Sequence, residues 1–493
     1  MKGALALVLL WAVGCEEAPR YGSVPVARAP HPVWQPRSAR RLAPDETFRA
    51  QMPRASPATG TELPVVAETT LANGVRVLTV ERHGLPVASL RIVVSWGALQ
   101  APPGVAALAV EMLFAGTSRR EGVALRQMLS EMGAQVEWST SYDDVSITAH
   151  VPATNASDTL NALTEAVRFS IFPADEIAEA RSDLIARIDH QSSSPESAAA
   201  TQLDAMLYPA PHPYHAPVDG DPQALRRIGR NELASFWRTA STPSLTTILV
   251  AGDVDRTALV TQIHGLLDDW SGATGEPRIL PAIGSSPNPR VVLLDHAGDP
   301  QAVVRVGWLV PDRRSPDIAA FRTLAAVVSE RLYRNLRIER GKTYGVQSFV
   351  WPRVGASEFV FTTAVDRDGL ADALRELFSE IDDVRRQSLD EREMPAARAL
   401  ATTFVWRSLE TSGAVVDALT PVATYKEPLN LFFSRLRTPN APPENVQAVA
   451  KRYLDVEGRA VVAVGDAKYL RPAFEQVGLT DVVVRPLVVA NSR

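Results

Sequence analysis

The side chains that could bind a metal ion are sparse in this sequence. A zinc site built on one helix needs two histidines about a turn apart and a glutamate that activates the bound water. The chain has eight histidines, and only two of them, in His212-Pro-Tyr-His215, are closely spaced. Because Pro213 disfavours a regular helix there, we do not expect these two on one helix face. The remaining histidines are scattered and predict no zinc site: His31, His83, His150, His190, His264 and His296.

The segment Gly104–Thr117 has the form of a catalytic helix but lacks most of its chemistry. Pro103 precedes it and Gly116 closes it, as is typical of a short helix. It follows two predicted strands, a place where many α+β enzymes carry a catalytic helix. Its one potential zinc ligand is Glu111, and a single carboxylate binds zinc weakly. Glu111 is then either a polar position of an amphipathic helix or a residue that contacts a partner or solvent.

Length and composition are those of a globular protein with about two domains. The chain has 493 residues, of which 46% are hydrophobic and 22% are charged. Its net charge of −5 is small for this length, so we expect no nucleic acid among its partners. No stretch approaches the roughly 20 apolar residues that a membrane-spanning helix needs.

The only cysteine, Cys15, follows a short apolar run at the N-terminus. Residues 1–15 have the positive start and apolar stretch of a signal peptide, and Ala12-Val-Gly-Cys15 resembles a bacterial lipobox, in which the cysteine becomes lipidated. The alternative is a plain secretory signal with an incidental cysteine. We expect an exported lipoprotein, anchored through Cys15 on the periplasmic side of the inner or outer membrane. Residues 16–65 are rich in Pro, Arg, Ala and Ser, which predicts a disordered tether.

Two stretches of about 200 residues repeat one order of elements. The clearest echo is between Thr246–Asp253 and Arg459–Asp466, because each is an apolar strand that ends in Gly-Asp and precedes an amphipathic helix. The order predicts an α+β fold with two homologous α/β-sandwich domains from an internal duplication. The expected boundaries are 66–272 for the N-terminal domain, 273–288 for a linker and 289–488 for the C-terminal domain. Strands are predicted near 75–80, 87–96, 135–140, 145–151 and 245–250, and again near 290–295, 302–308, 344–350, 358–365 and 459–464.

This arrangement resembles the M16 peptidases, the insulinase and pitrilysin family, and within them the two-domain processing-peptidase group. The resemblance covers roughly residues 66–485 and implies an M16-like fold for both domains. The order and spacing of several passages carry it, more than any one of them. These passages are Leu71-Ala-Asn-Gly-Val-Arg-Val77, Gly104–Thr117, Gly133-Ala134 with Tyr142-Asp-Asp144, His212-Pro-Tyr214 with Gly220, Val250-Ala-Gly-Asp253 and Leu336–Tyr344.

The resemblance implies that the zinc site of the family is degenerate in this chain. Active members carry an inverted motif, His-x-x-Glu-His, and its three functional positions fall at Ala107, Val110 and Glu111. The third family ligand, a glutamate on a later helix, falls near Ala186-Arg187, where neither residue is acidic. Alanine and valine cannot ligate a metal. We therefore expect no catalytic residue and no metal in this chain, and zinc in a partner subunit instead.

The same resemblance assigns substrate binding to Arg340 and Tyr344. Family members use the two residues of Arg-Gly-x-x-Tyr to hold the substrate backbone near the zinc, and Arg340-Gly-Lys-Thr-Tyr344 keeps that spacing. Guanidinium and phenol groups can polarise a carbonyl or stabilise an oxyanion. The alternative is structural, with Gly341 as a helix cap, Arg340 beside the helix dipole and Tyr344 packed in a strand. One departure from the family is Leu324–Arg331, which replaces a glycine-rich stretch.

Three functions are compatible with these features. The leading hypothesis is a subunit that is inactive alone and forms a heterodimer with a zinc-bearing M16 homologue, in which Arg340 and Tyr344 bind a peptide or unfolded polypeptide. The second is a lipid-anchored scaffold that has the M16 fold and no proteolytic role. The third, an independent metalloprotease, requires stoichiometric zinc in the purified chain.

Overall fold

The computed structural model describes residues 63–273, 275–283, 290–387, 389, 394–437 and 441–487. The chain divides into two compact units, Met1–Glu62 and Leu63–Arg493, and every described residue belongs to the second. The predicted signal peptide, Cys15 and nearly all of the predicted tether lie outside the described residues, as does part of the predicted linker. In the described part of the chain, no helix combines the length and the apolar character needed to cross a membrane.

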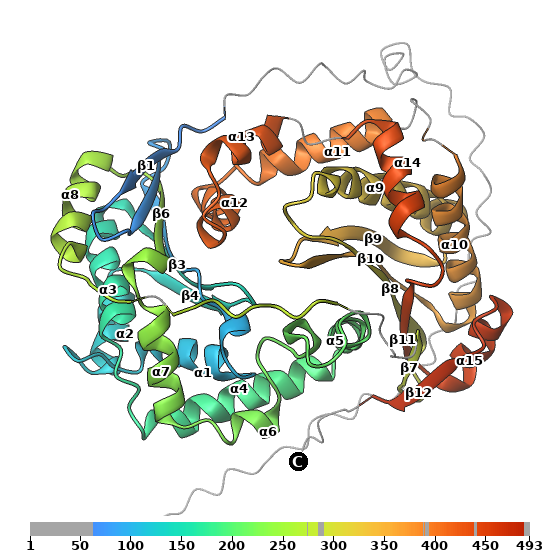
Figure 1. Cartoon of the computed structure of the whole chain (residues 1–493), viewed down its shortest axis with the longest axis horizontal. Helices are drawn as coiled ribbons and strands as arrows, with labels where there is room; N and C mark the ends of the chain where they lie inside the picture. Colours follow the sequence, from blue (N-terminus) through green and yellow to red (C-terminus); the bar gives the residue numbers. More distant parts are fainter. Residues whose placement is uncertain are drawn as a thin grey trace, which may run out of the picture. The chain divides into compact units, whose positions relative to one another are not determined.

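The first half of the second unit is built on a mixed six-stranded sheet with the order β1-β2-β6-β3-β5-β4 (Figure 1). Strands β2 and β6 run parallel, and the other neighbours run antiparallel. All seven residues of β6 are buried, which explains why its sequence is almost continuously apolar instead of alternating. The strands are β1 (Ala67–Thr70), β2 (Arg76–Glu81), β3 (Val87–Val94), β4 (Gln135–Thr140), β5 (Val145–Pro152) and β6 (Thr246–Gly252).

Helices of the first half cover one face of this sheet and share one apolar core with it. The predicted helix over Gly104–Thr117 is shorter than expected, because the α-helix ends at Glu111 and continues as the 3-10 helix η3 (Met112–Phe114). That α-helix is α1 (Val105–Glu111). The helices that follow it are α2 (Gly122–Glu131), α3 (Ala156–Phe169), α4 (Glu176–Ser192), α5 (Pro195–Leu207), η5 (Pro213–His215), α6 (Pro222–Leu225), α7 (Arg230–Ala240) and α8 (Arg256–Leu267).

The second half carries a sheet of the order β12-β7-β11-β8-β10-β9. Its strands are β7 (Val291–Asp295), β8 (Gln301–Pro311), β9 (Thr343–Trp351), β10 (Ala356–Asp366), β11 (Ala460–Gly465) and β12 (Val482–Pro486). Helix α9 ends at Leu332 and is followed directly by the π-helix η7 (Tyr333–Glu339). Two helices, α12 and α13, are not predicted from the sequence. The helices are α9 (Asp317–Leu332), α10 (Leu370–Arg386), α11 (Met394–Arg407), α12 (Ser412–Thr424), α13 (Leu429–Arg437), α14 (Pro443–Tyr453) and α15 (Ala467–Gln476).

The two sheets confirm the predicted α+β fold and the internal duplication. Strands β2 to β6 and strands β7 to β11 occupy equivalent places with the same directions, so that the parallel pair β2–β6 corresponds to the parallel pair β7–β11. The sixth strand differs. In the first sheet it is the N-terminal β1, antiparallel to β2, and in the second it is the C-terminal β12, parallel to β7.

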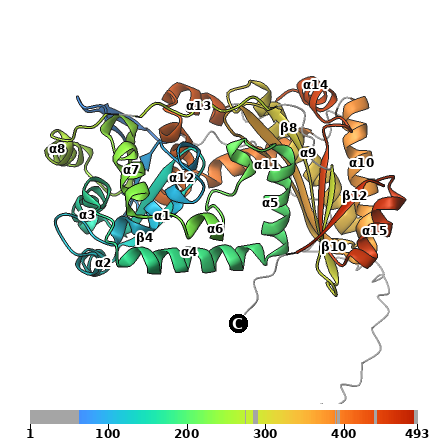
Figure 2. The ribbon, with the colours of Figure 1, turned by 60° about the horizontal axis from the view of Figure 1, so that its bottom comes forward.

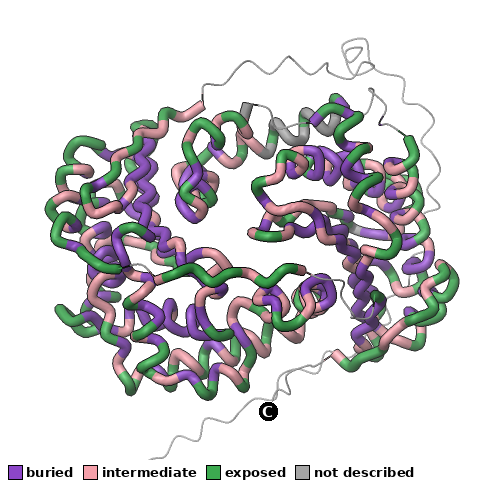
Figure 3. Tube along the Cα trace, in the orientation of Figure 1, coloured by how far each residue is buried: buried purple, intermediate pink, exposed green. Residues whose placement is uncertain are grey.

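Each half contributes one helix to the sheet of the other half. Helix α5 of the first half packs on β8 and β11, and α12 of the second half packs on β3 and β6 (Figures 1 and 2). Leu203 and Leu207 of α5 share an apolar cluster with Val462 of β11. Leu419 of α12 shares another with Leu249 of β6. The central strands of each sheet are therefore covered on both faces, and they form the buried layer in Figure 3.

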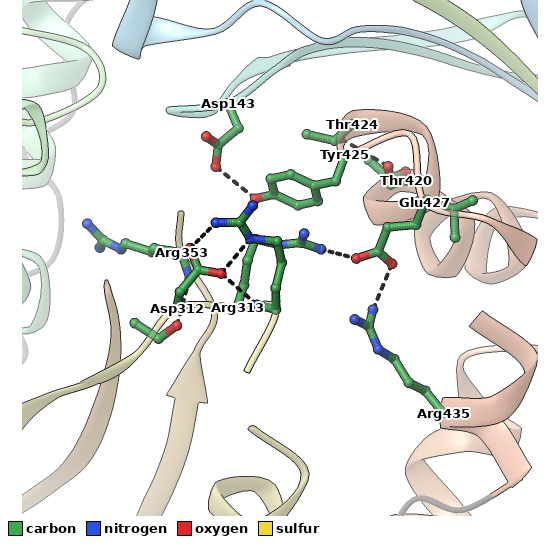
Figure 4. Close-up of polar contacts among 12 residues, drawn as sticks. Asp143, Asp312, Arg313, Arg353, Thr420, Thr424, Tyr425, Glu427 and Arg435 are labelled. Carbon is green, nitrogen blue, oxygen red and sulfur yellow. Dashed lines mark hydrogen bonds and ion pairs between the residues drawn. The ribbon is translucent and has the colours of Figure 1, made fainter. Parts of the chain in front are cut away.

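A polar network beside α12, which we call the joint network, connects the two halves (Figure 4). Tyr425 donates a hydrogen bond of 2.7 Å to Asp143, in the turn between β4 and β5. The guanidinium carbon of Arg313 lies 3.2 Å from the centre of the Tyr425 ring. Arg313 also pairs with the buried Glu427 at 2.6 Å, and Arg435 pairs with the same carboxylate at 2.7 Å. The end of α12 is thus attached to the first half by directional contacts as well as by apolar packing.

Arg353 is the buried centre of a second cluster between the halves. Its Nη2 lies 2.9 Å from Asp204 of α5 and 3.0 Å from Glu358 of β10. The Arg353 and Glu358 side chains are only 8% and 4% exposed. Burial, together with the neighbouring Asp204 carboxylate, raises the pKa of Glu358 to about 8. Three tyrosine rings of the first half lie 4.9 to 5.2 Å from the guanidinium carbon: Tyr142, Tyr208 and Tyr214.

Candidate functional site

A close backbone contact holds the start of helix α1. Gly104 immediately precedes the helix with a φ of +84°, and Gly220 has a φ of +75°. A Cβ added to Gly220 would lie 2.7 Å from the backbone nitrogen of Gly104. Only glycine combines a left-handed backbone with so close an approach. The contact positions the N-terminus of α1 against the loop that follows η5.

Replacing Gly220 with alanine is therefore expected to lower the free energy of unfolding by about 1–3 kcal/mol, through backbone strain and overpacking. Urea unfolding followed by circular dichroism measures the change. Gly84→Ala is the matched control, because a Cβ at Gly84 meets no atom within 4 Å. An unchanged midpoint for Gly220→Ala would show that the two loops separate without cost.

Ala107, Val110 and Glu111 lie on one face of α1 and line one cavity of about 510 Å³. Their spacing of three and four residues places the side chains together on a helix. Ala107 and Val110 are 4% and 1% exposed, whereas the Glu111 side chain is 20% exposed. The three predicted motif positions are thus neighbours, and only the third offers a polar group to the cavity.

Glu111 is held by two partners that sequence reasoning did not find. One carboxylate oxygen forms an ion pair with Arg187 of α4, and the other accepts a hydrogen bond of 3.2 Å from the indole N–H of Trp138. Neither interpretation of Glu111 from the sequence included an ion pair within the chain. The third-ligand position was expected near Ala186-Arg187, which gave the one sequence signal that this part of α4 faces the motif positions. Asp219 lines the same cavity, and burial raises the pKa of its carboxyl group.

The residues at this position do not fit a zinc ion. Zinc in proteins is held by three or four nitrogen, sulfur or oxygen ligands. The motif positions supply one carboxylate, Glu111, which already has a cationic partner, and Arg187 repels a second cation. Nowhere in the described ranges do three or more His, Cys, Asp or Glu residues form a group that could hold a metal ion. The polar groups at this place are those of the Glu111–Arg187 pair, Asp219 and the indole N–H of Trp138.

That strand, β4, forms one edge of the first sheet. Within the described residues it pairs with β5 alone, from Gln135 opposite His150 to Thr140 opposite Val145. A strand paired on one side directs alternate N–H and C=O groups outward. Trp138, 36% exposed, lines both the 510 Å³ cavity and a second cavity of about 450 Å³. An open edge with flanking cavities is an arrangement to which extended peptides can add a strand.

Arg340 and Tyr344 lie in the second half, at the passage from η7 into β9. Arg340 follows the last residue of η7, and its guanidinium pairs with Glu376 of α10 at 2.9 Å. The Arg340 side chain is 47% exposed, so it remains accessible. Gly341 has a φ of +61°, as the helix-cap interpretation expected. Tyr344 is the second residue of β9, and its side chain lies outside the described part of the structure.

His212 belongs to a packed loop. Its ring stacks on Tyr208 with centroids 5.2 Å apart, and its Nδ1 accepts a hydrogen bond of 3.2 Å from the backbone N–H of Tyr214. Burial lowers the pKa of the imidazole. Nδ1 of the nearby His215 contacts the backbone oxygen of Tyr208. Both rings therefore serve the same turn, as expected for a structural loop.

The fold and the site together define a class of protein: a duplicated α+β chain with an ion pair between helices α1 and α4 at the cavity beside β4. Residues 76–214 match the family model described as insulinase (peptidase family M16), and residues 227–400 match the peptidase M16 inactive domain. The two segments together cover well over half of the chain. The chain belongs to the M16 peptidase family.

Individual relatives agree with this assignment. An uncharacterised zinc protease of Mycobacterium tuberculosis is 25% identical over 417 residues, which cover 82% of this chain and 94% of that protein. A probable mitochondrial-processing peptidase subunit beta of Arabidopsis thaliana is 25% identical over 211 residues, 42% of this chain and 40% of that protein. The crystal structure of a peptidase M16 inactive domain from Pseudomonas fluorescens has the same fold, with a TM-score of 0.70 at 23% identity, covering 81% of this chain and 98% of that one.

Proposed function

We propose that this chain is the non-catalytic, polypeptide-binding subunit of a heteromeric M16 metalloendopeptidase. A separate zinc-bearing homologue supplies the metal and the catalytic residues. Arg340 and Tyr344 of this chain bind the backbone of a peptide or unfolded polypeptide. The observation that carries the proposal is the Glu111–Arg187 ion pair, which fills the metal position of a chain that otherwise keeps the family fold.

Loss of the metal site does not remove the surfaces that bind a polypeptide. The outer edge of β4 is unpaired within the described residues, and two cavities lie along it. Backbone hydrogen bonds to such an edge are independent of side-chain sequence, which suits unfolded substrates. Unpaired strand edges promote aggregation. An open edge is therefore a disadvantage for a protein that binds no polypeptide there.

The accessibility of Arg340 supports a role outside its own half. The guanidinium end of its ion pair with Glu376 is 47% exposed, so a substrate carbonyl can reach Arg340 from solvent. The relative from Arabidopsis thaliana is named as a subunit, which is compatible with a heteromeric assembly. We further propose that the complex is held at the periplasmic side of a membrane through a lipid on Cys15.

The test is to purify this chain, its zinc-bearing homologue and the two together, and to measure cleavage of a fluorogenic peptide. We expect activity only in the complex. Replacing Arg340 with alanine and Tyr344 with phenylalanine in this chain is expected to lower kcat/KM of the complex about 100-fold, the usual effect of removing groups that stabilise developing charge.

Arg334→Ala is the matched control. Arg334 is also exposed, lies on the same π-helix and pairs with Glu330, so its loss tests a general charge effect. Full activity of a complex that carries the Arg340/Tyr344 double variant would contradict the proposal. A complex that forms without any peptidase activity would favour the scaffold instead, and stoichiometric zinc in this chain alone would favour an independent metalloprotease.

A further inference from the structure

The Glu111–Arg187 ion pair lies between the two helices on which the M16 resemblance places the metal ligands. Glu111 takes the position of the second motif histidine on α1. Arg187 itself takes the position near which the third ligand falls on α4, 76 residues later. A zinc ion at this place would join the same two helices. In this chain the guanidinium of Arg187 and the carboxylate of Glu111 connect α4 to α1 directly, without a metal ion.

The surroundings of Arg187 are acidic. Asp219 and Glu137 are among the residues that line the same cavity as Glu111. The charge of Arg187 lowers the pKa of the Asp219 carboxyl and that of Glu111 raises it, so Asp219 lies within electrostatic reach of both. The indole N–H of Trp138 fixes the second Glu111 oxygen, so the carboxylate keeps one orientation toward the guanidinium.

We infer that Arg187 is an internal substitute for the metal ion. Its positive charge joins α1 to α4 through Glu111 and keeps divalent cations out of the site. The inference does not depend on the proposed function, because a chain that is stable without metal can be a subunit, a scaffold or neither. It predicts that removing the charge weakens the first half, and that reversing the charge creates a requirement for a divalent cation.

The experiment follows the thermal unfolding of the full-length protein in EDTA and in ZnCl₂, with bound zinc measured after equilibrium dialysis. The wild type is expected to melt at the same temperature in both and to bind no zinc. Arg187→Gln is expected to melt about 2–4 °C lower in both conditions, since the lost ion pair is partly buried. Arg187→Glu is expected to melt lower still in EDTA and to recover in zinc, because the introduced carboxylate joins Glu111 and Asp219 as a third oxygen ligand.

Two further variants separate this role from a general charge effect. Arg120→Gln removes an ion pair of similar exposure, with Glu165, elsewhere in the first half. It is expected to remain insensitive to zinc. The double variant Glu111→Arg/Arg187→Glu reverses the pair and is expected to regain stability without zinc. It also keeps the test decisive if Arg187→Glu alone fails to fold.

Three results would overturn the inference. The first is stoichiometric zinc in the wild-type chain, and the second is an Arg187→Gln variant as stable as the wild type. The third is a folded Arg187→Glu variant that zinc does not stabilise. The first result would also count against the proposed function, whereas the other two leave pairing with a homologue to the peptidase assay of the complex.

Discussion

Replacing Arg353 with leucine is expected to lower the free energy of unfolding by about 3–5 kcal/mol, the cost of breaking a buried ion pair by removing one partner. The substitution leaves the buried Glu358 and the partly exposed Asp204 beside each other without the cation that both contact. It also removes the charge from among three tyrosine rings. Urea unfolding at pH 7, followed by tryptophan fluorescence and circular dichroism, measures the change.

Arg314→Leu is the matched control for this substitution. Arg314 is 77% exposed and pairs with Asp312 at 2.9 Å, so its loss is expected to change stability by less than about 1 kcal/mol. If Arg353→Leu proved no more destabilising than Arg314→Leu, the contacts of Arg353 would not be needed to hold the two halves together. In that case the apolar packing of α5 and α12 would be sufficient to hold the halves together.

The stability of the protein is expected to fall as pH rises from about 5 to 8, and Glu358 is the main reason. In the folded state its pKa is about 8, against a usual value of 4.5. Between these two values the folded chain holds a proton that the unfolded chain has released. Each pH unit in this window therefore lowers the free energy of unfolding by up to about 1.4 kcal/mol for this single group. Above the folded pKa the contribution is constant.

The Glu358→Gln variant isolates this effect, because glutamine resembles the protonated acid and does not titrate. Unfolding in urea at intervals from pH 5 to pH 9 should give a steeper decline for the wild type than for the variant. Other groups titrate equally in both proteins and cancel in the difference. Parallel pH profiles would mean that Arg353 keeps Glu358 ionised throughout this range, so that burial is the weaker influence on its pKa.

Much of the fold could be predicted from the sequence, because local patterns determine it. The apolar run of Thr246–Asp253 and its echo at Arg459–Asp466 mark equivalent central strands, and the structure places them as β6 and β11. The exchange of α5 and α12 could not be predicted. A helix with one apolar face shows that it packs on a sheet but not on which sheet. In α12 the interior Pro421 obscured even the helix itself.

The motif positions of the candidate site could be located from the sequence, but their contacts could not. Ala107 and Val110 are unable to bind a metal whatever their surroundings, so the sequence alone shows a degenerate motif. The pairing of Glu111 with Arg187 depends on how α1 and α4 cross, which is a tertiary property. The buried cluster around Arg353 was invisible for the same reason, since its members come from four separate segments of the chain. No local pattern marks a charged residue as buried.

The exchange of α5 and α12 also constrains how the duplicated gene arose. A protein made of a single half would have one covered sheet face and one bare apolar face, because the helix that covers the bare face belongs to the other half. Such an ancestor could bury that face only by taking the helix of a second copy, as in a domain-swapped homodimer. Fusion of two copies then made an intermolecular exchange intramolecular. Once fused, the two copies were free to diverge in sequence while each still covered the sheet of its neighbour.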